Sequence, residues 1–399
     1  MVSIIDSNLY DAEATINHVQ NLAFHRSSET VGESKGIFYI QEALKNRNVD
    51  SKVEYFSYAG AKTYLTRIIF LIIFGYLLLS RLIVILIICL AIRFFLPTER
   101  SLSLVKKEKS KNLITTIPCK NNKEKRPVII FSAHYDTFSA NLPYKIQTVL
   151  IFLFRIMFIP YLVMAVFYSV WFVIDFLSGI GAGNALISLI VYTSIIQIFV
   201  LIIMLLLIYN NKKSLGSIDN ASGVSILIEI TKILKKNPLK NIDVIFIWTG
   251  AEEWGLLGSR NYVKEHINNL NEEYDLNKSF NINIDMVGTY IGLLDKSGLF
   301  KNRIINDSLN EEFETSAKNL NIPMIRYSRR ISPKTDHRSF LSLAKKSKSK
   351  FQVACFHSDK DSQYIHSSKD TPEKCSSPIL NGCLEICYFT IKRIDTYFD

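Results

Sequence analysis

The chain alternates between stretches with the mixed polar and apolar pattern of a globular domain and long stretches that are almost wholly apolar. Residues 11–24 and 33–44 carry apolar side chains at the spacing of helices, and residues 52–58 alternate as an edge strand does. Residues 112–117 and 127–133 have the composition of strands. These segments predict the first part of a globular domain.

Globular sequence returns at Asn211 and continues to the end of the chain. Apolar runs and turn residues predict further elements here: a helix at 224–234, a buried strand at 242–247, a helical pattern after Arg260, a strand that ends within 283–288, a helix near 307–319 and a last helix at 377–397. Residues 345–350 are rich in lysine and predict a solvated loop. Strands that alternate with helices predict an α/β fold, a sheet with helices on both faces.

Three blocks interrupt this pattern. Residues 68–96 are almost wholly apolar, and residues 149–173 and 185–209 each exceed the roughly 20 residues that cross a bilayer as a helix. We therefore predict a membrane helical hairpin at 64–97 and two transmembrane helices at 143–210.

The globular segments 1–63, 98–142 and 211–399 would then form one discontinuous domain. Each insertion must return the chain to the side from which it left, because residues of one domain cannot lie on opposite sides of a bilayer. This requirement favours an even number of crossings in each insertion.

Composition and charge fit the same interpretation. The hydrophobic share is 48%, the formal net charge is +11, and basic residues such as Arg67, Arg93, Lys212 and Lys213 flank the apolar blocks. The loop between the two predicted transmembrane helices, residues 178–184, contains no lysine or arginine. The apolar blocks predict a multi-pass integral membrane protein, and the positive-inside rule places its catalytic domain in the cytoplasm. No nucleic-acid-binding signature is present, so a lipid bilayer is the expected partner.

The chemistry centres on adjacent carboxylates, Glu252 and Glu253, which follow the predicted strand 242–247. Two like charges this close resist ionising together, so a cation is expected beside them, and a divalent metal is the simplest candidate. A solvated pair of glutamates in a loop is the alternative if the pair is taken alone.

Four further groups favour the metal. These are His134 with Asp136, Asp219, Asp285, and His366 with Asp370. Histidine and carboxylate ligands without thiolate suit zinc, and sites in open α/β sheets collect at the carboxyl ends of strands. His134 and Asp136 lie two residues apart on an extended segment, so Asp136 can hold the second imidazole nitrogen or the next ligand.

The order and wording of these segments resemble the co-catalytic zinc exopeptidase family that includes bacterial leucyl aminopeptidases, glutamate carboxypeptidases and glutaminyl cyclases. The matching segments are Ala133-His134-Tyr135-Asp136-Thr137, Asp219-Asn220-Ala221-Ser222-Gly223, Glu252-Glu253-Trp254-Gly255-Leu256-Leu257-Gly258-Ser259, Asp285-Met286-Val287-Gly288, and Tyr364-Ile365-His366 with Asp370-Thr371. The resemblance covers nearly all of the chain outside the apolar insertions. It implies the family's mixed-sheet zinc-exopeptidase fold, here interrupted by two transmembrane helical insertions.

The resemblance also implies two zinc ions per chain. Asp219 would bridge them, His134 and Asp285 would complete one site, and Glu253 and His366 the other. Glu252 would act as general base toward the bridging water and then protonate the leaving amine. Asp136 is predicted to be the second catalytic residue, through its hold on the metal ligands. The peptide bond after the bridging aspartate is typically cis in this family, which predicts a cis bond between Asp219 and Asn220.

A further segment, Thr335-Asp336-His337, resembles a family Ser-Asp-His segment, with threonine in place of serine. It predicts that Asp336 and His337 line the substrate cleft and bind no metal.

The resulting expectation is a membrane-anchored zinc aminopeptidase that acts on peptides with a free amino terminus. Three alternatives stay open: a glutaminyl cyclase-like acyltransferase, a carboxypeptidase of acidic peptides that uses arginines such as Arg326, Arg329, Arg330 and Arg338, and a catalytically silent membrane scaffold. The scaffold is disfavoured because such relatives usually lose ligands, and every expected ligand is present here.

Overall fold

The computed structural model describes residues 11–58, 108–121, 124–140, 213–298 and 303–399, together with scattered positions between 143 and 199. The chain divides into two compact units. One consists of Met1–Phe56, Lys109–Ser139 and Lys212–Asp399, and the other of Ser57–Glu108 and Ala140–Asn211. The domain boundaries given above stay a prediction, and the site described below lies in the first unit.

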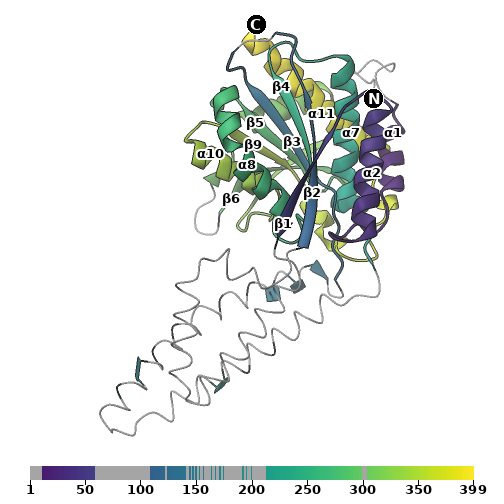
Figure 1. Ribbon diagram of the computed structural model, residues 1–399. Coiled ribbons are helices and arrows are strands. Elements are labelled where there is room, and N and C mark those ends of the chain that lie inside the picture. Colours follow the sequence, from purple (N-terminus) through teal and green to yellow (C-terminus); the bar gives the residue numbers. More distant parts are fainter. Residues whose placement is uncertain are drawn as a thin grey trace. The chain divides into compact units, whose positions relative to one another are not determined.

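A nine-stranded mixed sheet organises the first unit (Figure 1). Its strand order is β1-β2-β4-β3-β5-β9-β6-β7, and β8 pairs with β6. The strands are β1 (Lys52–Tyr58), β2 (Glu108–Ile117), β3 (Val128–His134), β4 (Asp243–Thr249), β5 (Phe280–Ile284), β6 (Ile291–Ser297), β7 (Arg303–Ile304), β8 (Met324–Arg329) and β9 (Gln352–Phe356).

The centre of the sheet is parallel. β3 pairs in parallel with β4 and with β5, and β5 pairs in parallel with β9. β2 joins β4 in antiparallel register. Every residue of β3, β4 and β5 is buried, as expected for strands that are covered on both faces.

Helices cover both faces of the sheet (Figure 1). On one side α7 (Ser222–Lys236) packs against β3. It contacts three further helices, α1 (Ala14–Asn21), α2 (Val31–Lys45) and α11 (Ser377–Asp395). α11 in turn contacts α9 (Leu309–Asn319). On the other side lie α8 (Leu257–Glu273) and α10 (His337–Ser347). The expected α/β architecture with helices on both faces is therefore confirmed for this unit.

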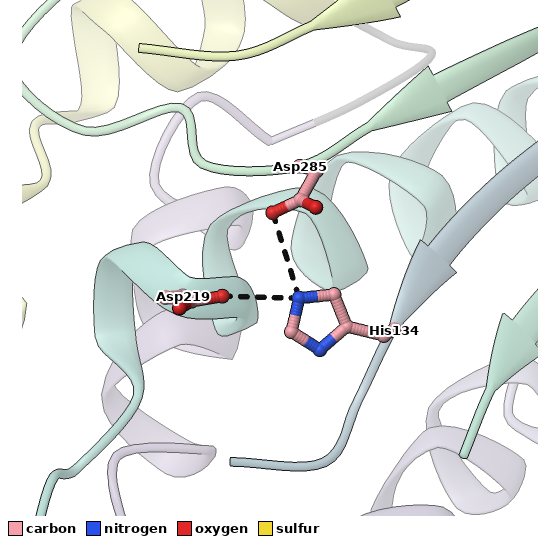
Figure 2. Close-up of side chains that lie close together, drawn as sticks. All are labelled: His134, Asp219 and Asp285. Carbon is pink, nitrogen blue, oxygen red and sulfur yellow. Dashed lines mark ion pairs between the residues drawn. The ribbon is translucent and has the colours of Figure 1, made fainter. Parts of the chain in front are cut away.

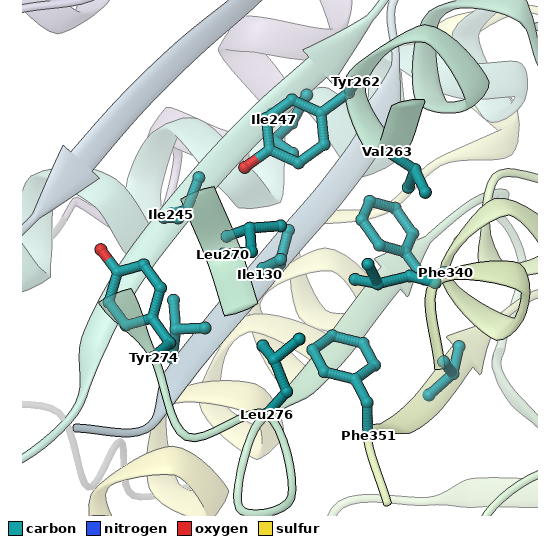
Figure 3. Packing of buried hydrophobic residues seen from close by; sticks show 13 residues of the cluster. Ile130, Ile245, Ile247, Tyr262, Val263, Leu270, Tyr274, Leu276, Phe340 and Phe351 are labelled. Carbon is teal, nitrogen blue, oxygen red and sulfur yellow. The ribbon is translucent and has the colours of Figure 1, made fainter. Parts of the chain in front are cut away.

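Successive side chains of a strand point to opposite faces of the sheet, and the core beneath α8 and α10 is built from one of these two sets. Ile130, Ile245 and Ile247 of the sheet pack with Tyr262 of α8 and Phe340 of α10 (Figure 3). The intervening residues point to the opposite face, where the rings of Phe131 and Phe246 stack with centroids 5.2 Å apart. The same strands thus bury apolar surface in both layers.

The prediction of transmembrane insertions is corrected. Among the described residues, no helix is long and apolar enough to cross a membrane. The blocks at 64–97 and 143–210 lie outside those residues apart from the scattered positions. Length and hydropathy identify only a candidate span, because a helix that is apolar all round can also be buried in protein. The predicted multi-pass membrane location and cytoplasmic orientation depended on those spans and are corrected with them.

A smaller correction concerns the lysine-rich segment at 345–350. It was predicted as a loop, but its first residues form the last turn of α10. Buried Phe340 and Leu343 lie on one side of that helix, and Lys345 and Lys346 near its carboxyl terminus favour the helix dipole.

Candidate metal centre

The carboxyl ends of the central strands meet at one edge of the sheet and carry most of the predicted site residues. His134 is the last residue of β3 and pairs in register with Thr249, the last residue of β4. Glu252 and Glu253 follow β4 within four residues, and Asp285 directly follows β5. Parallel strands therefore bring together residues that are more than 100 positions apart in the chain.

Asp219 enters this edge from the segment that leads into α7. It lies in a short turn, Ser217–Ala221, and the peptide bond between Asp219 and Asn220 is cis, as predicted. The side chain of Asn220 fixes the turn, because its Oδ1 accepts the main-chain N–H groups of Gly223 and Met286 and its Nδ2 donates to the carbonyl of Ile284. The turn is thus fastened to the loop that carries Asp285.

The two oxygens of Asp219 face two different groups of side chains. Oδ1 lies 3.0 Å from Nε2 of His134, and that nitrogen is 3.5 Å from Oδ1 of Asp285 (Figure 2). Oδ2 lies 3.3 Å from Nε2 of His366, which is 3.0 Å from Oε1 of Glu253. Within each group the ligand atoms all lie within 4.8 Å of one another. A single carboxylate thus connects two sets of three ligands.

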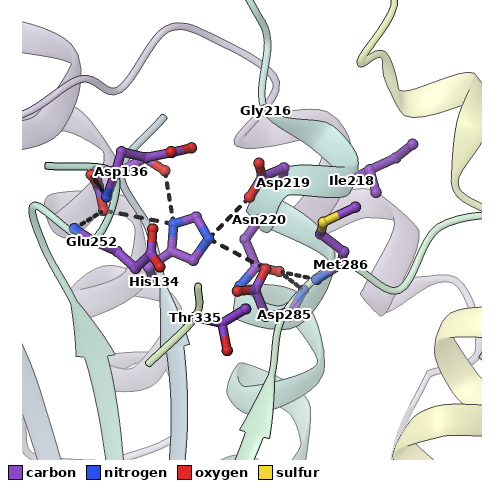
Figure 4. Close-up of polar contacts among 12 residues, drawn as sticks. His134, Asp136, Gly216, Ile218, Asp219, Asn220, Glu252, Asp285, Met286 and Thr335 are labelled. Atoms are coloured by element: carbon purple, nitrogen blue, oxygen red, sulfur yellow. Dashed lines mark hydrogen bonds and ion pairs between the residues drawn. The ribbon is translucent and has the colours of Figure 1, made fainter. Parts of the chain in front are cut away.

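Asp136 organises the groups without contributing a ligand atom to either (Figure 4). Its carboxylate accepts the main-chain N–H of Glu252 at 3.0 Å and that of Glu253 at 3.3 Å. The Nδ1 atom of His134 is 3.1 Å from the main-chain oxygen of Asp136 and 3.6 Å from its carboxylate. Asp136 therefore connects the end of β3 to the loop of the paired glutamates.

Buried carboxylates crowd together in this cluster and shift the pKa values of their neighbours. Burial raises the pKa of Glu252 well above its usual range, and the charge of Glu253 adds to the shift. Burial lowers the pKa of His134 and of His366, but nearby carboxylates outweigh it, so that the pKa of His134 rises well above its usual range and that of His366 rises to about 10. A cation placed among these side chains would relieve the repulsion between the carboxylates.

An orphaned atom points in the same direction. Among the described residues, Oε1 of Glu252 is buried and has no hydrogen-bond partner. Buried polar atoms without partners are rare, and such an atom beside two ligand groups fits a site built for a bound metal and water. The donor set of imidazole nitrogens and carboxylate oxygens suits zinc.

The backbone around the site adopts conformations that most side chains avoid. Ala251, Leu256, Met286 and His366 all have positive φ angles between 52° and 68°. Each lies within a few residues of a predicted site residue or is one. Such conformations cluster at functional sites because the surrounding structure must hold them.

The structure places Asp336 and His337 beside the groups but within the protein interior. Asp336 is 1% exposed and its Oδ2 accepts the hydroxyl of Thr249, while its Oδ1 has no hydrogen-bond partner among the described residues. His337 is fully buried between the hydroxyls of Thr335 and Ser332. Their assignment to the substrate cleft stays a prediction.

Two contributions were not foreseen. Asp370 had been grouped with His366, but its carboxylate instead accepts the main-chain N–H groups of Ile218 and Asp219, at 2.6 and 3.3 Å. Burial and the charge of Asp219 raise the pKa of Asp370 to about 7. Arg26, which carried no motif, lies fully buried below the same turn. In the sequence Arg26 stands between His25 and Ser27, with no motif around it, so nothing there distinguishes it from a surface arginine.

Comparisons with known proteins agree with this geometry. Residues 206–391 match peptidase family M28. A segment of 75 residues, 18% of this chain, is 45% identical to Aminopeptidase YwaD of Bacillus subtilis, and it spans 15% of the length of that protein. The expected enzyme class, a zinc-dependent metallo-aminopeptidase, agrees with these matches.

Solved structures share the fold over nearly the whole chain. A zinc aminopeptidase from Bacillus subtilis superposes with a TM-score of 0.54 and 15% identity, covering 96% of this chain and 95% of its own. An aminopeptidase from Aneurinibacillus sp. strain AM-1 gives 0.56 and 14%, covering 97% and 94%. A glutaminyl cyclase from an Acidobacteriales bacterium also gives 0.56 and 14%, covering 97% and 96%. At these identities the likeness supports the fold alone.

Proposed function

We propose that the protein is a zinc-dependent aminopeptidase that hydrolyses the first peptide bond of peptides with a free amino terminus. The observation that carries the proposal is the position of Asp219, whose two oxygens face two separate groups of imidazole and carboxylate ligands. The matches to peptidase family M28 and to Aminopeptidase YwaD support the reaction class.

In this proposal, one zinc ion is held by His134, Asp219 and Asp285, and a second by Asp219, Glu253 and His366. When bound, zinc supplies Lewis acidity, which lowers the pKa of water and stabilises negative charge on a carbonyl oxygen. Asp136 keeps His134 and the glutamate loop in position through the contacts described above. The residues thus divide into ligands and a residue that orients them.

Glu252 is the proposed general base. Its orphaned Oε1 is free to accept a proton from the attacking water and to pass it to the leaving amine. Burial raises the pKa of Glu252, so its carboxylate takes up a proton more readily than that of an exposed glutamate, which suits a group that accepts a proton and then delivers it. We expect the enzyme to bind the free amino terminus of the substrate beside the zinc ions. It would then cleave only the first peptide bond, as an exopeptidase does.

Two of the four arginines named for an acidic-peptide carboxypeptidase are already ion-paired within the protein. Arg326 is ion-paired with Asp295 at 2.6 Å and with Glu314 at 2.5 Å. Arg329 is ion-paired with Asp359 at 2.7 Å. Side chains already neutralised by carboxylates are weaker anchors for an acidic substrate.

The test compares the wild type with a Glu252→Gln variant on peptides blocked or free at each end. We expect cleavage only of peptides with a free amino terminus, and a loss of roughly 100-fold or more in kcat for the variant, which keeps its zinc. Glu272→Gln, at an exposed position of α8, is the matched control and should keep full activity. Cyclisation of glutaminyl peptides without hydrolysis would favour the cyclase alternative, and bound zinc with neither activity would contradict the proposal.

A further inference from the structure

Arg26 is a buried charged residue that has no part in the proposed mechanism, and apolar packing does not explain its position. It follows α1 in the chain, is 0% exposed, and is among the largest fully buried side chains of the described residues. Burying a guanidinium is costly unless each of its donors is satisfied. The position of Arg26 therefore needs a reason.

All of its described side-chain bonds go to main-chain carbonyl groups. Nε donates to Tyr135 at 2.8 Å, and Nη2 donates to Gly216 at 2.9 Å. Nη1 donates to Leu215 and Phe24 at 3.0 Å each, and also to Leu22. Within the described part of the chain, no carboxylate forms an ion pair with it. Arg26 thus acts as a cross-link between segments of main chain.

The cross-linked segments are the two that deliver the proposed ligands. Tyr135 lies between His134 and Asp136, and Gly216 lies three residues before Asp219 (Figure 4 shows Gly216 at the start of the turn). The main-chain N–H of Arg26 also donates to the hydroxyl of Thr137, just after Asp136. One residue therefore fixes the end of β3 relative to the turn that carries Asp219.

Two glycines shape the space around this side chain. A Cβ atom at Gly36 of α2 would lie 3.0 Å from Cδ of Arg26. At Gly216, where φ is +63°, a Cβ atom would lie 3.0 Å from Nη2 of Arg26 and 2.1 Å from Cγ2 of Thr137. The space that the Arg26 side chain occupies therefore depends on glycine at both positions, one in α2 and one before the turn.

Arg26 is also a cation next to the carboxylate cluster. Burial lowers the pKa of Arg26 to about 10, while the charges of Asp370, Asp136 and Asp219 act in the opposite direction, so the side chain stays charged at neutral pH. Asp370 accepts the N–H groups of Ile218 and Asp219 within the turn, directly after the Leu215 and Gly216 carbonyl groups that Arg26 bonds. The turn is therefore held by the Asp370 carboxyl group at two of its N–H groups, and by the Arg26 guanidinium at the two carbonyl groups just before it.

We propose that Arg26 is a positioning residue of the active site, whose guanidinium holds the His134–Thr137 segment and the Leu215–Asp219 segment, which leads into the turn, at the separation that zinc binding requires. Its positive charge also stabilises the carboxylate cluster before zinc enters. This inference rests on the proposed function, because it assigns Arg26 a task in binding the zinc ions.

The competing explanation is that Arg26 only stabilises the interior. In that case its replacement would lower the free energy of unfolding but leave the zinc affinity and kcat of the folded protein unchanged. A positioning role predicts loss of zinc affinity and of kcat in protein that is still folded, with little change in KM because Arg26 is buried away from solvent.

The decisive variant is Arg26→Lys, which keeps the charge but cannot reach five carbonyl groups at once. We expect roughly a 10- to 100-fold loss in zinc affinity, measured by competition with a chelator, and a similar loss in kcat. The matched control is Arg126→Lys. Arg126 precedes β3 at the opposite end of the strand and pairs with Asp243 at 2.7 Å. Thermal unfolding of all proteins shows how much is folded.

Gly36→Ala provides an independent test that leaves Arg26 in place. Alanine normally stabilises a helix relative to glycine, but here the added methyl group presses on Cδ of Arg26. We expect a smaller loss of zinc affinity in the same direction, and this variant decides the matter if Arg26→Lys does not fold. Zinc affinity and kcat equal to those of the control, in folded variants, would overturn the inference. Failure of the wild type itself to bind zinc would instead overturn the proposed function, and the inference with it.

Discussion

Asp136 contributes no ligand atom to either group, yet it contacts several of their parts. Its carboxylate accepts the N–H groups of Glu252 and Glu253 and lies near Nδ1 of His134. Replacement of residues that orient metal ligands in this way typically lowers the affinity for the metal by roughly 10- to 100-fold. At the scale of single residues, the proposed metal ligands are thus distinct from Asp136, which holds those ligands in position.

Replacing this carboxylate tests the separation. Asp136→Asn keeps the size of the side chain but offers only one oxygen to the two N–H groups. We expect roughly a 10- to 100-fold loss in both zinc affinity and kcat, because the glutamate loop loses one of its two anchors. Asp275→Asn, in the turn that follows α8 and outside both ligand groups, is the control and should change neither. Unchanged zinc affinity in Asp136→Asn would contradict the assigned role.

His337 provides a prediction about pH. Burial lowers its pKa to about 3, with help from the charges of Arg338 and His357, whereas the unfolded chain has the ordinary value of about 6.5. Between these values the unfolded state binds a proton that the folded state does not. The free energy of unfolding therefore decreases as pH falls below about 6.5, by up to about 1.4 kcal/mol per pH unit from this residue.

The measurement compares denaturant unfolding of the wild type and His337→Gln from pH 7 to pH 4. Other groups contribute equally to both proteins, so the difference between the two curves isolates His337. We expect the variant to show the weaker pH dependence. Parallel curves would show that His337 does not titrate as its burial requires.

At the scale of elements, the strands and helices with clear periodicity were predictable. The strand at 52–58 coincides with β1, and the helix at 307–319 contains α9. β6 and β9 were not predicted, because short apolar runs lack a period that distinguishes them from a buried helix segment. α10 was not predicted at all, and its lysine-rich last turn was predicted as a loop because consecutive charged residues are typical of a solvated surface.

The packing of α10 carries the prediction at this scale. Phe340 is fully buried against Tyr262 of α8 and the adjoining core of the sheet. Phe340→Ala should lower the free energy of unfolding by about 3–5 kcal/mol, because the surrounding residues fill the cavity only in part. Phe38→Ala on α2, where the side chain is 63% exposed, is the control and should have little effect. Denaturant unfolding measures both, and equal effects would contradict the described core.

At the scale of the whole molecule, the predicted metal ligands came from segments spread over more than 200 residues, and the fold brings them to one edge. The resemblance of the motifs to the zinc exopeptidase family implied which residues meet. The parallel strands β3, β4 and β5 explain only part of this, because they bring His134, the paired glutamates and Asp285 to one edge of the sheet. The tasks of Arg26 and Asp370 were not predictable, since their partners are main-chain groups chosen by tertiary packing. The predicted membrane spans are corrected, as no described helix meets the requirement for crossing a bilayer.

The central claim is that Asp219 connects two zinc sites. Metal analysis of the purified protein and of Asp219→Asn and His366→Ala variants tests it most directly. We predict two zinc ions per chain in the wild type, one in His366→Ala, and the loss of tight binding at both sites in Asp219→Asn, since both groups depend on its oxygens. A single zinc ion in the wild type, or two retained in folded Asp219→Asn, would contradict the account.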